Sequence, residues 1–130
     1  MENIVYLDTH LVVWLYGKRL DLIPDYVLGI LNNNDLLISP IVKLELQYLF
    51  EIERIKKQAG TILKALHSEI GLKFCVLDFP NIINSAVKEK WTRDPFDRII
   101  TAQASVNKAI LLTKDLTILD NYNYAKWDKK

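Results

Sequence analysis

Short apolar runs, separated by longer segments of helical spacing, constrain the fold of this chain more than any other feature. Five such runs occur along its 130 residues. They cover residues 3–7, 36–39, 73–77, 109–113 and, more weakly, 122–127. Strands that are apolar throughout are buried on both faces, which is typical of parallel sheets covered by helices. The pattern predicts an α/β fold, a three-layer α/β/α sandwich around a central parallel sheet of four to five strands.

Helical patterns fill the intervals between these runs. We expect helices over residues 11–16, 24–31, 40–50, 53–69, 80–88 and 95–107, with a short one at 116–119. No linker rich in Pro, Gly or Ser interrupts the alternation, and there is no internal repeat. The length suits a single domain over residues 1–130 with its own hydrophobic core.

The composition indicates which partners and which cellular compartment to expect. A net charge of +1 gives no strong global attraction to nucleic acid or membrane, so an anionic partner needs a local basic patch or bound cations. The single cysteine, Cys75, excludes an intramolecular disulfide and a cysteine-based zinc site, and its apolar neighbours predict a buried thiol. No apolar stretch reaches the roughly 18 residues of a membrane span, and no secretory signal opens the chain. We therefore expect a cytoplasmic protein without a membrane partner.

Two aspartates follow predicted strands. Asp8 comes directly after the first run, and Asp115 lies just beyond the fourth. Because the carboxyl ends of parallel strands meet at one edge of the sheet, both are expected where ligands bind in open α/β sheets. Each also has a purely structural interpretation, since Asp8 (or Thr9) and Asp115 could cap the helix that follows.

Glu45 needs a different explanation. Ser39 followed by Pro40 predicts a helix start, so Glu45 lies more than one turn inside the helix and too far along to cap it. Its spacing places it on the same face as apolar residues such as Val42 and Leu49. A charge on an apolar face is costly unless it is paired or coordinated. Glu45 is therefore half of an ion pair with a lysine or arginine, a carboxylate at the edge of the apolar stripe, or a ligand of a bound ion.

The stretch RDPFDRIITAQA, residues 93–104, holds two further aspartates at a predicted helix start. Asp94 as N-cap with Pro95 at the first helical position is a strong local signal, and Asp94 can pair with Arg98 one turn on. Asp97 then occupies the third helical position, where it favours the positive helix end and could close a capping-box-like pair. Glu or Gln is the usual residue for that reciprocal role. Local structure thus explains Asp94 almost completely but Asp97 only in part.

Taken together, the acidic residues predict a metal site at the carboxyl edge of the sheet. Clustered carboxylates raise one another's pKa unless a cation lies among them. Oxygen ligands without a His or Cys set favour Mg²⁺ or Mn²⁺ over zinc. One or two such ions can activate water and stabilise the charge on a phosphodiester during hydrolysis.

Four stretches of the chain resemble the PIN-domain ribonucleases, with the closest likeness to the VapC-type toxins of bacterial type II toxin–antitoxin pairs. They are YLDTH, SPIVKLEL, RDPFDRIITAQA and LLTKD, and the third is the most specific. The resemblance covers nearly the whole chain. It implies the three-layer fold, a Mg²⁺- or Mn²⁺-dependent endoribonuclease and a partner antitoxin that blocks the site.

The resemblance also implies roles for individual residues. The acidic positions of the family fall on Asp8, Glu45, Asp97 and Asp115, which would hold one or two ions for hydrolysis of RNA. Asp94 belongs to the DPFD signature and is either a ligand or only a helix cap.

Residues beside these acids have accessory interpretations. The hydroxyls of Thr9 and Thr113 could hydrogen-bond a ligand or its water. Candidates for contacts with the RNA backbone are Arg93, Arg98 and Lys114. His10 is expected at the surface of the first helical turn, and the three tryptophans are more typical of a core or an interface than of base stacking. The apolar segments 11–16 and 44–52 could leave surface for an antitoxin helix or for the second subunit of a homodimer.

Two other functions stay open at this level. One is a metal-dependent DNA nuclease or phosphatase, although a phosphatase of the aspartyl-phosphate kind would need a second aspartate where this chain has His10. The other is a catalytically silent PIN-like module that binds RNA or protein. The presence of all four acids weighs against the silent module.

Overall fold

The computed structural model describes residues 3–128 and contains one five-stranded sheet in the order β3-β2-β1-β4-β5. The strands are β1 (Ile4–Leu7), β2 (Asp35–Ile38), β3 (Lys73–Phe74), β4 (Ile110–Leu112) and β5 (Ala125–Lys126). Every neighbouring pair is parallel. The predicted parallel sheet is therefore confirmed, including the weak fifth strand.

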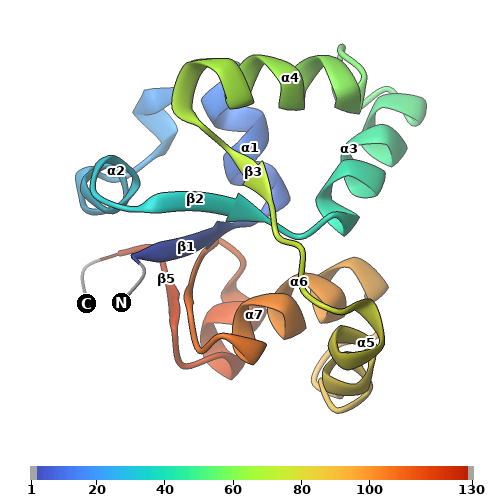
Figure 1. The fold of residues 1–130 in the computed structure, drawn as a ribbon. Coiled ribbons are helices and arrows are strands. Elements are labelled where there is room, and N and C mark those ends of the chain that lie inside the picture. Colours follow the sequence, from blue (N-terminus) through green and yellow to red (C-terminus); the bar gives the residue numbers. More distant parts are fainter. Residues whose placement is uncertain (1–2, 129–130) are drawn as a thin grey trace.

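Helices cover both faces of this sheet and complete the three layers (Figure 1). One layer contains α1 (Thr9–Tyr16), α3 (Ile41–Glu51) and α4 (Ala59–Ile70), and α2 (Asp25–Asn32) precedes β2 after a short 3-10 turn, η1 (Leu20–Leu22). The other layer contains α5 (Phe79–Val87), α6 (Pro95–Val106) and α7 (Leu116–Asn121). No helix within residues 3–128 is both long and apolar enough to cross a membrane.

The central strand explains why the sequence runs were apolar throughout. Val5, Tyr6 and Leu7 of β1 and Leu111 and Leu112 of β4 are almost completely buried between the two helical layers. Full burial of a leucine or valine side chain contributes about 1.5–3 kcal/mol to folding. The strands nearest the middle of the sheet thus hold the layers together and fix the edge from which the loops emerge.

Three predicted elements are much shorter in the structure, and one of them is the fifth strand, expected near 122–127, which pairs only at Ala125 and Lys126. The strand expected over 73–77 pairs with β2 only at Lys73 and Phe74, with one further bond from the Cys75 amide to the Ile38 carbonyl (2.8 Å). The chain then leaves the sheet, and Val76 is 93% exposed. The helix expected over 53–69 begins only at Ala59. Glu53 has a positive φ of 63°, which ends the preceding helix and starts a turn instead.

The strand order changes direction at β1. From β1 the chain adds β2 and β3 on one side, whereas β4 and β5 pair on the other. In open α/β sheets, ligands bind outside the carboxyl ends of the strands at such a switch point. The segments that follow β1, β2 and β4 are therefore the ones in which to look for a site.

Candidate metal centre at the carboxyl edge of the sheet

Asp8 lies at the end of β1, where it is the N-cap of α1 and only 7% exposed. The Thr9 amide donates to its Oδ1 (2.8 Å), and the Thr113 hydroxyl donates to its Oδ2 (2.6 Å). Burial raises the pKa of this carboxyl, while the two hydrogen bonds act to lower it. Both oxygens of Asp8 are thus held in fixed positions by donors from neighbouring segments.

Thr113 links Asp8 to the acid that follows β4. Its hydroxyl donates to Asp8 and accepts a hydrogen bond from the Asp115 amide (3.0 Å). Asp115 is the N-cap of α7, and its Oδ1 accepts from the Ile118 amide (3.0 Å). The predicted capping roles of Asp8 and Asp115 are both observed. Capping also fixes the direction in which each carboxylate leaves the sheet edge.

Glu45 comes from α3, in the same helical layer as α1, and is held by the same kind of contact. The Ser39 hydroxyl accepts from the Ile41 amide (3.2 Å) at the start of α3, and Glu45 follows one turn later. The Thr9 hydroxyl donates to Glu45 Oε1 (2.6 Å). Burial, with repulsion from Asp8 and Asp94, raises the pKa of Glu45. No lysine or arginine among residues 3–128 forms an ion pair with Glu45, so the ion-pair interpretation is wrong.

Asp94 is the N-cap of α6, as its sequence context predicts. Its Oδ1 accepts from the amides of Phe96 (2.8 Å) and Asp97 (3.2 Å). The two further local roles are wrong. The Asp94 amide donates to the Thr92 hydroxyl (3.2 Å) rather than to Asp97, so no reciprocal cap forms. Arg98 Nε donates to the Thr92 carbonyl (2.8 Å) instead of pairing with Asp94.

Asp97 is the acid whose environment departs most from that of an ordinary helix surface. Its carboxylate makes no hydrogen bond or ion pair within the described part of the chain, although its backbone amide is capped. Burial raises the pKa of Asp97 to about 7, with added repulsion from all the other acids of the set. These are Asp94, Asp8, Asp115 and Glu45. The acids singled out in the sequence therefore lie within one electrostatic neighbourhood.

The chemistry of this set fits a hard divalent cation. As the side chains stand, no three His, Cys, Asp or Glu residues between residues 3 and 128 are close enough to hold one ion. However, the donors are all carboxylate oxygens, the ligands that Mg²⁺ and Mn²⁺ favour. A cation among them would also reverse the repulsion that raises the pKa of Asp97.

Basic side chains lie beside the acids without neutralising them. Arg93 is exposed, and Arg98 is engaged with the Thr92 carbonyl. Lys114 Nζ lies over the indole of Trp14, 5.3 Å from the ring centroid. Sequence reasoning missed this contact, because nothing in the spacing of residues 100 positions apart indicates that they meet.

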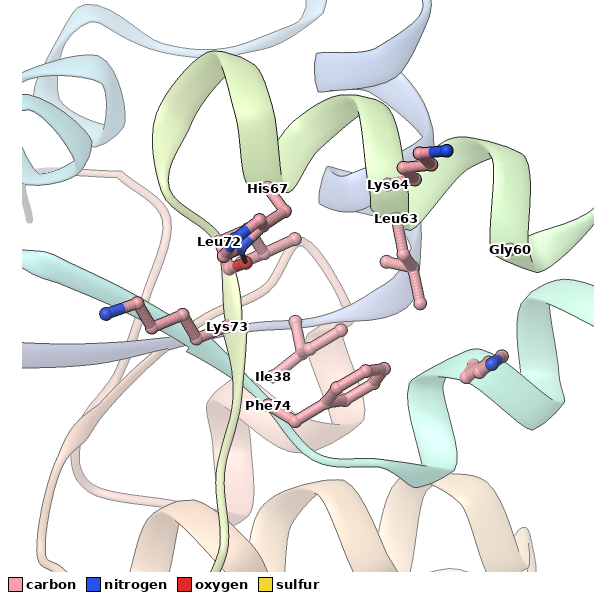
Figure 2. Close-up of a pocket in the computed structure, with 9 residues that line it drawn as sticks. Ile38, Gly60, Leu63, Lys64, His67, Leu72, Lys73 and Phe74 are labelled. Atoms are coloured by element: carbon pink, nitrogen blue, oxygen red, sulfur yellow. Dashed lines mark hydrogen bonds between the residues drawn. The ribbon is translucent and has the colours of Figure 1, made fainter.

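An apolar cavity of about 350 Å³ lies away from these acids, between α4 and the β3 edge of the sheet (Figure 2). Ile38, Leu63 and Phe74 point into it, and no carboxylate lines it. His67 borders the cavity, where its Nδ1 is 3.0 Å from the Leu72 carbonyl. The cavity therefore offers none of the acidic groups gathered at the carboxyl edge.

Comparison with known proteins assigns the family. The family model described as "PIN domain" matches residues 5–122. This chain belongs to the PIN domain family. The match includes the segments that carry all the acids described above, so these are features of its PIN domain. A search of curated proteins found no match.

Solved structures agree with the PIN assignment at the level of the fold. A chain of VapBC2 from Rickettsia felis, bound to a DNA fragment from its promoter, matches with a TM-score of 0.65 and 22% identity, over 96% of this chain and 99% of that one. A VapBC-1 chain from nontypeable Haemophilus influenzae gives 0.64 and 20%, over 96% of both chains. A DNA-bound VapBC chain from Salmonella typhimurium gives 0.65 and 19%, over 98% of both. The predicted PIN-like α/β/α fold is confirmed.

Proposed function

We propose that this PIN domain is a Mg²⁺- or Mn²⁺-dependent endoribonuclease that acts as the toxin of a toxin–antitoxin pair. The observation that carries the proposal is the environment of Asp97. Its carboxylate has no protein partner among residues 3–128, and burial together with repulsion from four other acids raises its pKa to about 7. Such an arrangement is unfavourable for folding alone, so a role in cation binding accounts for it.

Asp8, Glu45, Asp97 and Asp115 would hold the ion or ions. A divalent cation at this place supplies an activated water molecule and neutralises charge that develops on the phosphodiester. Neighbouring threonines orient two of these acids by hydrogen bonds. Thr113 and the Thr9 amide fix both oxygens of Asp8, and the Thr9 hydroxyl fixes one oxygen of Glu45. Asp97 is left free to turn toward a cation.

The toxin role rests on the solved structures of similar fold. Those from Rickettsia felis, Haemophilus influenzae and Salmonella typhimurium are VapBC assemblies, and another match, from Klebsiella pneumoniae, is named a toxin–antitoxin complex (TM-score 0.62, 16% identity, over 94% of this chain and 95% of that one). By that likeness we propose an antitoxin protein as the partner of this chain. A short neighbouring reading frame that encodes a DNA-binding protein would support this pairing.

Cleavage of structured RNA by the purified protein in Mg²⁺ tests the nuclease. We expect cutting by the native protein, none in EDTA and none by Asp97→Asn. The matched control is Asp120→Asn, which changes an exposed acid on α7 and should cut like the native protein. Cleavage that survives both EDTA and Asp97→Asn would contradict the proposed site.

The same preparation separates the alternatives. A DNA nuclease would cut single- or double-stranded DNA in preference to RNA, and a phosphatase would release inorganic phosphate from a small phosphomonoester. A catalytically silent module would bind RNA without cutting it. The His10 position, which offers no second aspartate for a phosphoenzyme, favours hydrolysis of a diester over the phosphatase.

A further inference from the structure

Lys114, like Arg93 and Arg98, is directly adjacent in sequence to an acid of the acidic centre, yet it does not neutralise these acids. The acidic centre is the set of carboxylates described above, Asp8, Glu45, Asp94, Asp97 and Asp115. Lys114 lies between Thr113, whose hydroxyl contacts Asp8, and Asp115. Within residues 3–128, Lys114 forms no ion pair with any carboxylate. Its ammonium instead lies over the indole of Trp14 at 5.3 Å from the centroid, within the range of a cation–π contact.

Trp14 is a rigid platform for this contact. It is half-buried on α1 and packs against the buried Trp127, with 5.8 Å between the ring centroids. His10, one helical turn earlier, flanks the ring at 6.4 Å. The indole is therefore held from the core side, and its position sets where the Lys114 ammonium rests.

The place of this contact matters for a substrate that runs past the acids. Trp14 is six residues beyond Asp8 on the same helix, which places it about 9 Å farther along the axis at 1.5 Å per residue. RNA bound at the acidic centre would continue over neighbouring surface of this kind. Its phosphates need cations there, because the net charge of the chain supplies no general attraction.

Lys114 directly precedes Asp115, so its ammonium would be expected to pair with a nearby carboxylate if nothing else held it. An ammonium among the acids would satisfy the same charges that a divalent cation satisfies, and the two would compete. Holding Lys114 on an uncharged aromatic ring keeps its positive charge at the site without placing it among the metal-binding oxygens. The ring contact is also weak enough for a phosphate to displace it.

We propose that Lys114 binds an RNA phosphate beside the acidic centre and that Trp14 is its positioning residue, which keeps the ammonium out of the metal site. This inference rests on the proposed nuclease function. It adds to that function the group that contacts the substrate backbone and the reason why this group does not block the acids.

The phosphate contact is tested by RNA affinity. Fluorescence anisotropy of a labelled single-stranded RNA is measured in Mg²⁺ with an Asp97→Asn background that does not cut. Lys114→Met, which keeps the apolar stem, should weaken binding about tenfold. It should also reduce the slope of log affinity against log salt by about 0.7. Lys64→Met on the exposed face of α4 is the matched control and should change neither value. Equal values for the Lys114 and Lys64 variants would overturn the proposal.

The positioning role is tested by Mn²⁺ binding in calorimetry, which requires no turnover. Trp14→Leu frees the ammonium and should weaken Mn²⁺ binding several-fold, and the double variant with Lys114→Met should restore it. Trp14→Phe keeps more of the packing and should give a smaller loss, because phenylalanine is a weaker cation–π partner. Loss of affinity in Trp14→Leu that Lys114→Met does not restore would show a merely structural role and overturn this part.

Different results would overturn the nuclease function and the role of Lys114. A native protein that neither binds Mn²⁺ nor cuts RNA would overturn the proposed function and this inference together. A native protein that binds Mn²⁺ and cuts RNA, but whose Lys114→Met variant has the native salt slope, would overturn the inference alone.

Discussion

Asp8 and Asp97 reach the same acidic centre but are held in opposite ways. Asp8 ends a central strand, is almost fully buried, and has a protein donor on each carboxylate oxygen. Asp97 stands in the first turn of α6, and its carboxylate has no hydrogen bond within the described residues. Asp8 is thus preorganised by its surroundings, whereas the Asp97 carboxylate is partly buried and repelled by the other acids without any donor to stabilise its charge.

This difference distinguishes contacts that stabilise the fold from groups that serve only the proposed cleavage. The contacts of Asp8 also serve the fold, since they cap α1 and connect β1 to β4 through Thr113. The carboxylate of Asp97 serves no such purpose, and its charge opposes folding in the absence of a cation. Substitutions at the two sides of the centre should therefore separate effects on stability from effects on cleavage.

The largest expected effect comes from Asp97→Asn. Loss of a metal ligand should lower cleavage by more than about a hundredfold, since loss of an outer partner alone costs about 10–100-fold. Without metal, the same change should raise the free energy of unfolding at pH 8 by about 1–2 kcal/mol, after allowance for solvent screening, because a repelled charge is removed. Single-turnover cleavage and urea unfolding measure the two quantities. A less stable variant would contradict the comparison with Asp8.

Thr113→Val tests whether hydrogen bonds preorganise Asp8. The hydroxyl that donates to Asp8 and accepts from the Asp115 amide is lost while the shape of the side chain is kept. Mn²⁺ affinity in calorimetry should fall about 10–100-fold, and stability should fall by about 1–3 kcal/mol. Thr113→Ser retains the hydroxyl and is the control. Indistinguishable Val and Ser variants would mean that this hydrogen bond does not orient the acid.

The pH dependence of stability gives the next smaller effect. The folded-state pKa of Asp97 is about 7, above the ordinary value of 3.8, so the folded protein keeps a proton that the unfolded chain has released. The metal-free protein should therefore lose stability as pH rises from about 4 to 7, by about 1–2 kcal/mol from this group after screening. Asp8 and Glu45, whose pKa values are also raised, act in the same direction.

Urea unfolding at several pH values, in EDTA, measures this dependence. Asp97→Asn should flatten it in part, while Asp120→Asn should leave it unchanged. Stability that rises between pH 4 and 7 to the same extent in the native protein and in Asp97→Asn would contradict the raised pKa of Asp97.

Much of this arrangement could be predicted from the sequence, because the patterns that specify it involve residues close together in the chain. Apolar runs predict buried parallel strands, and the position of Asp8 or Asp115 after such a run predicts the edge at which it lies. The capping role of Asp94 is likewise contained in the four letters DPFD. What could not be predicted depends on partners distant in sequence. The bond from Thr9 to Glu45 joins residues 36 positions apart, and the Lys114–Trp14 contact joins residues 100 apart.

The wrong expectations have the same origin. Helical spacing allows Arg98 to pair with Asp94, but Arg98 Nε donates instead to the Thr92 carbonyl in the loop before α6. Glu45 could equally have met a lysine, and only the tertiary arrangement shows that Thr9 takes that place. Helical spacing fixes which groups can meet, whereas the loops and neighbouring layers decide which of them do.

Substitution of Asp94 gives the smallest expected effect. It tests directly whether Asp94 only caps α6 while Asp97 binds the ion. Asp94→Ala removes the cap and should cost about 1 kcal/mol in urea unfolding, whereas Asp94→Asn can still accept from the Phe96 amide and should cost little. Asparagine also removes one of the charges that raise the pKa of Asp97, so that pKa should fall toward its ordinary value. Cleavage by Asp94→Asn should stay near the native rate. A loss of more than about a hundredfold, with stability unchanged, would instead make Asp94 a ligand of the ion, because loss of an outer partner costs only about 10–100-fold.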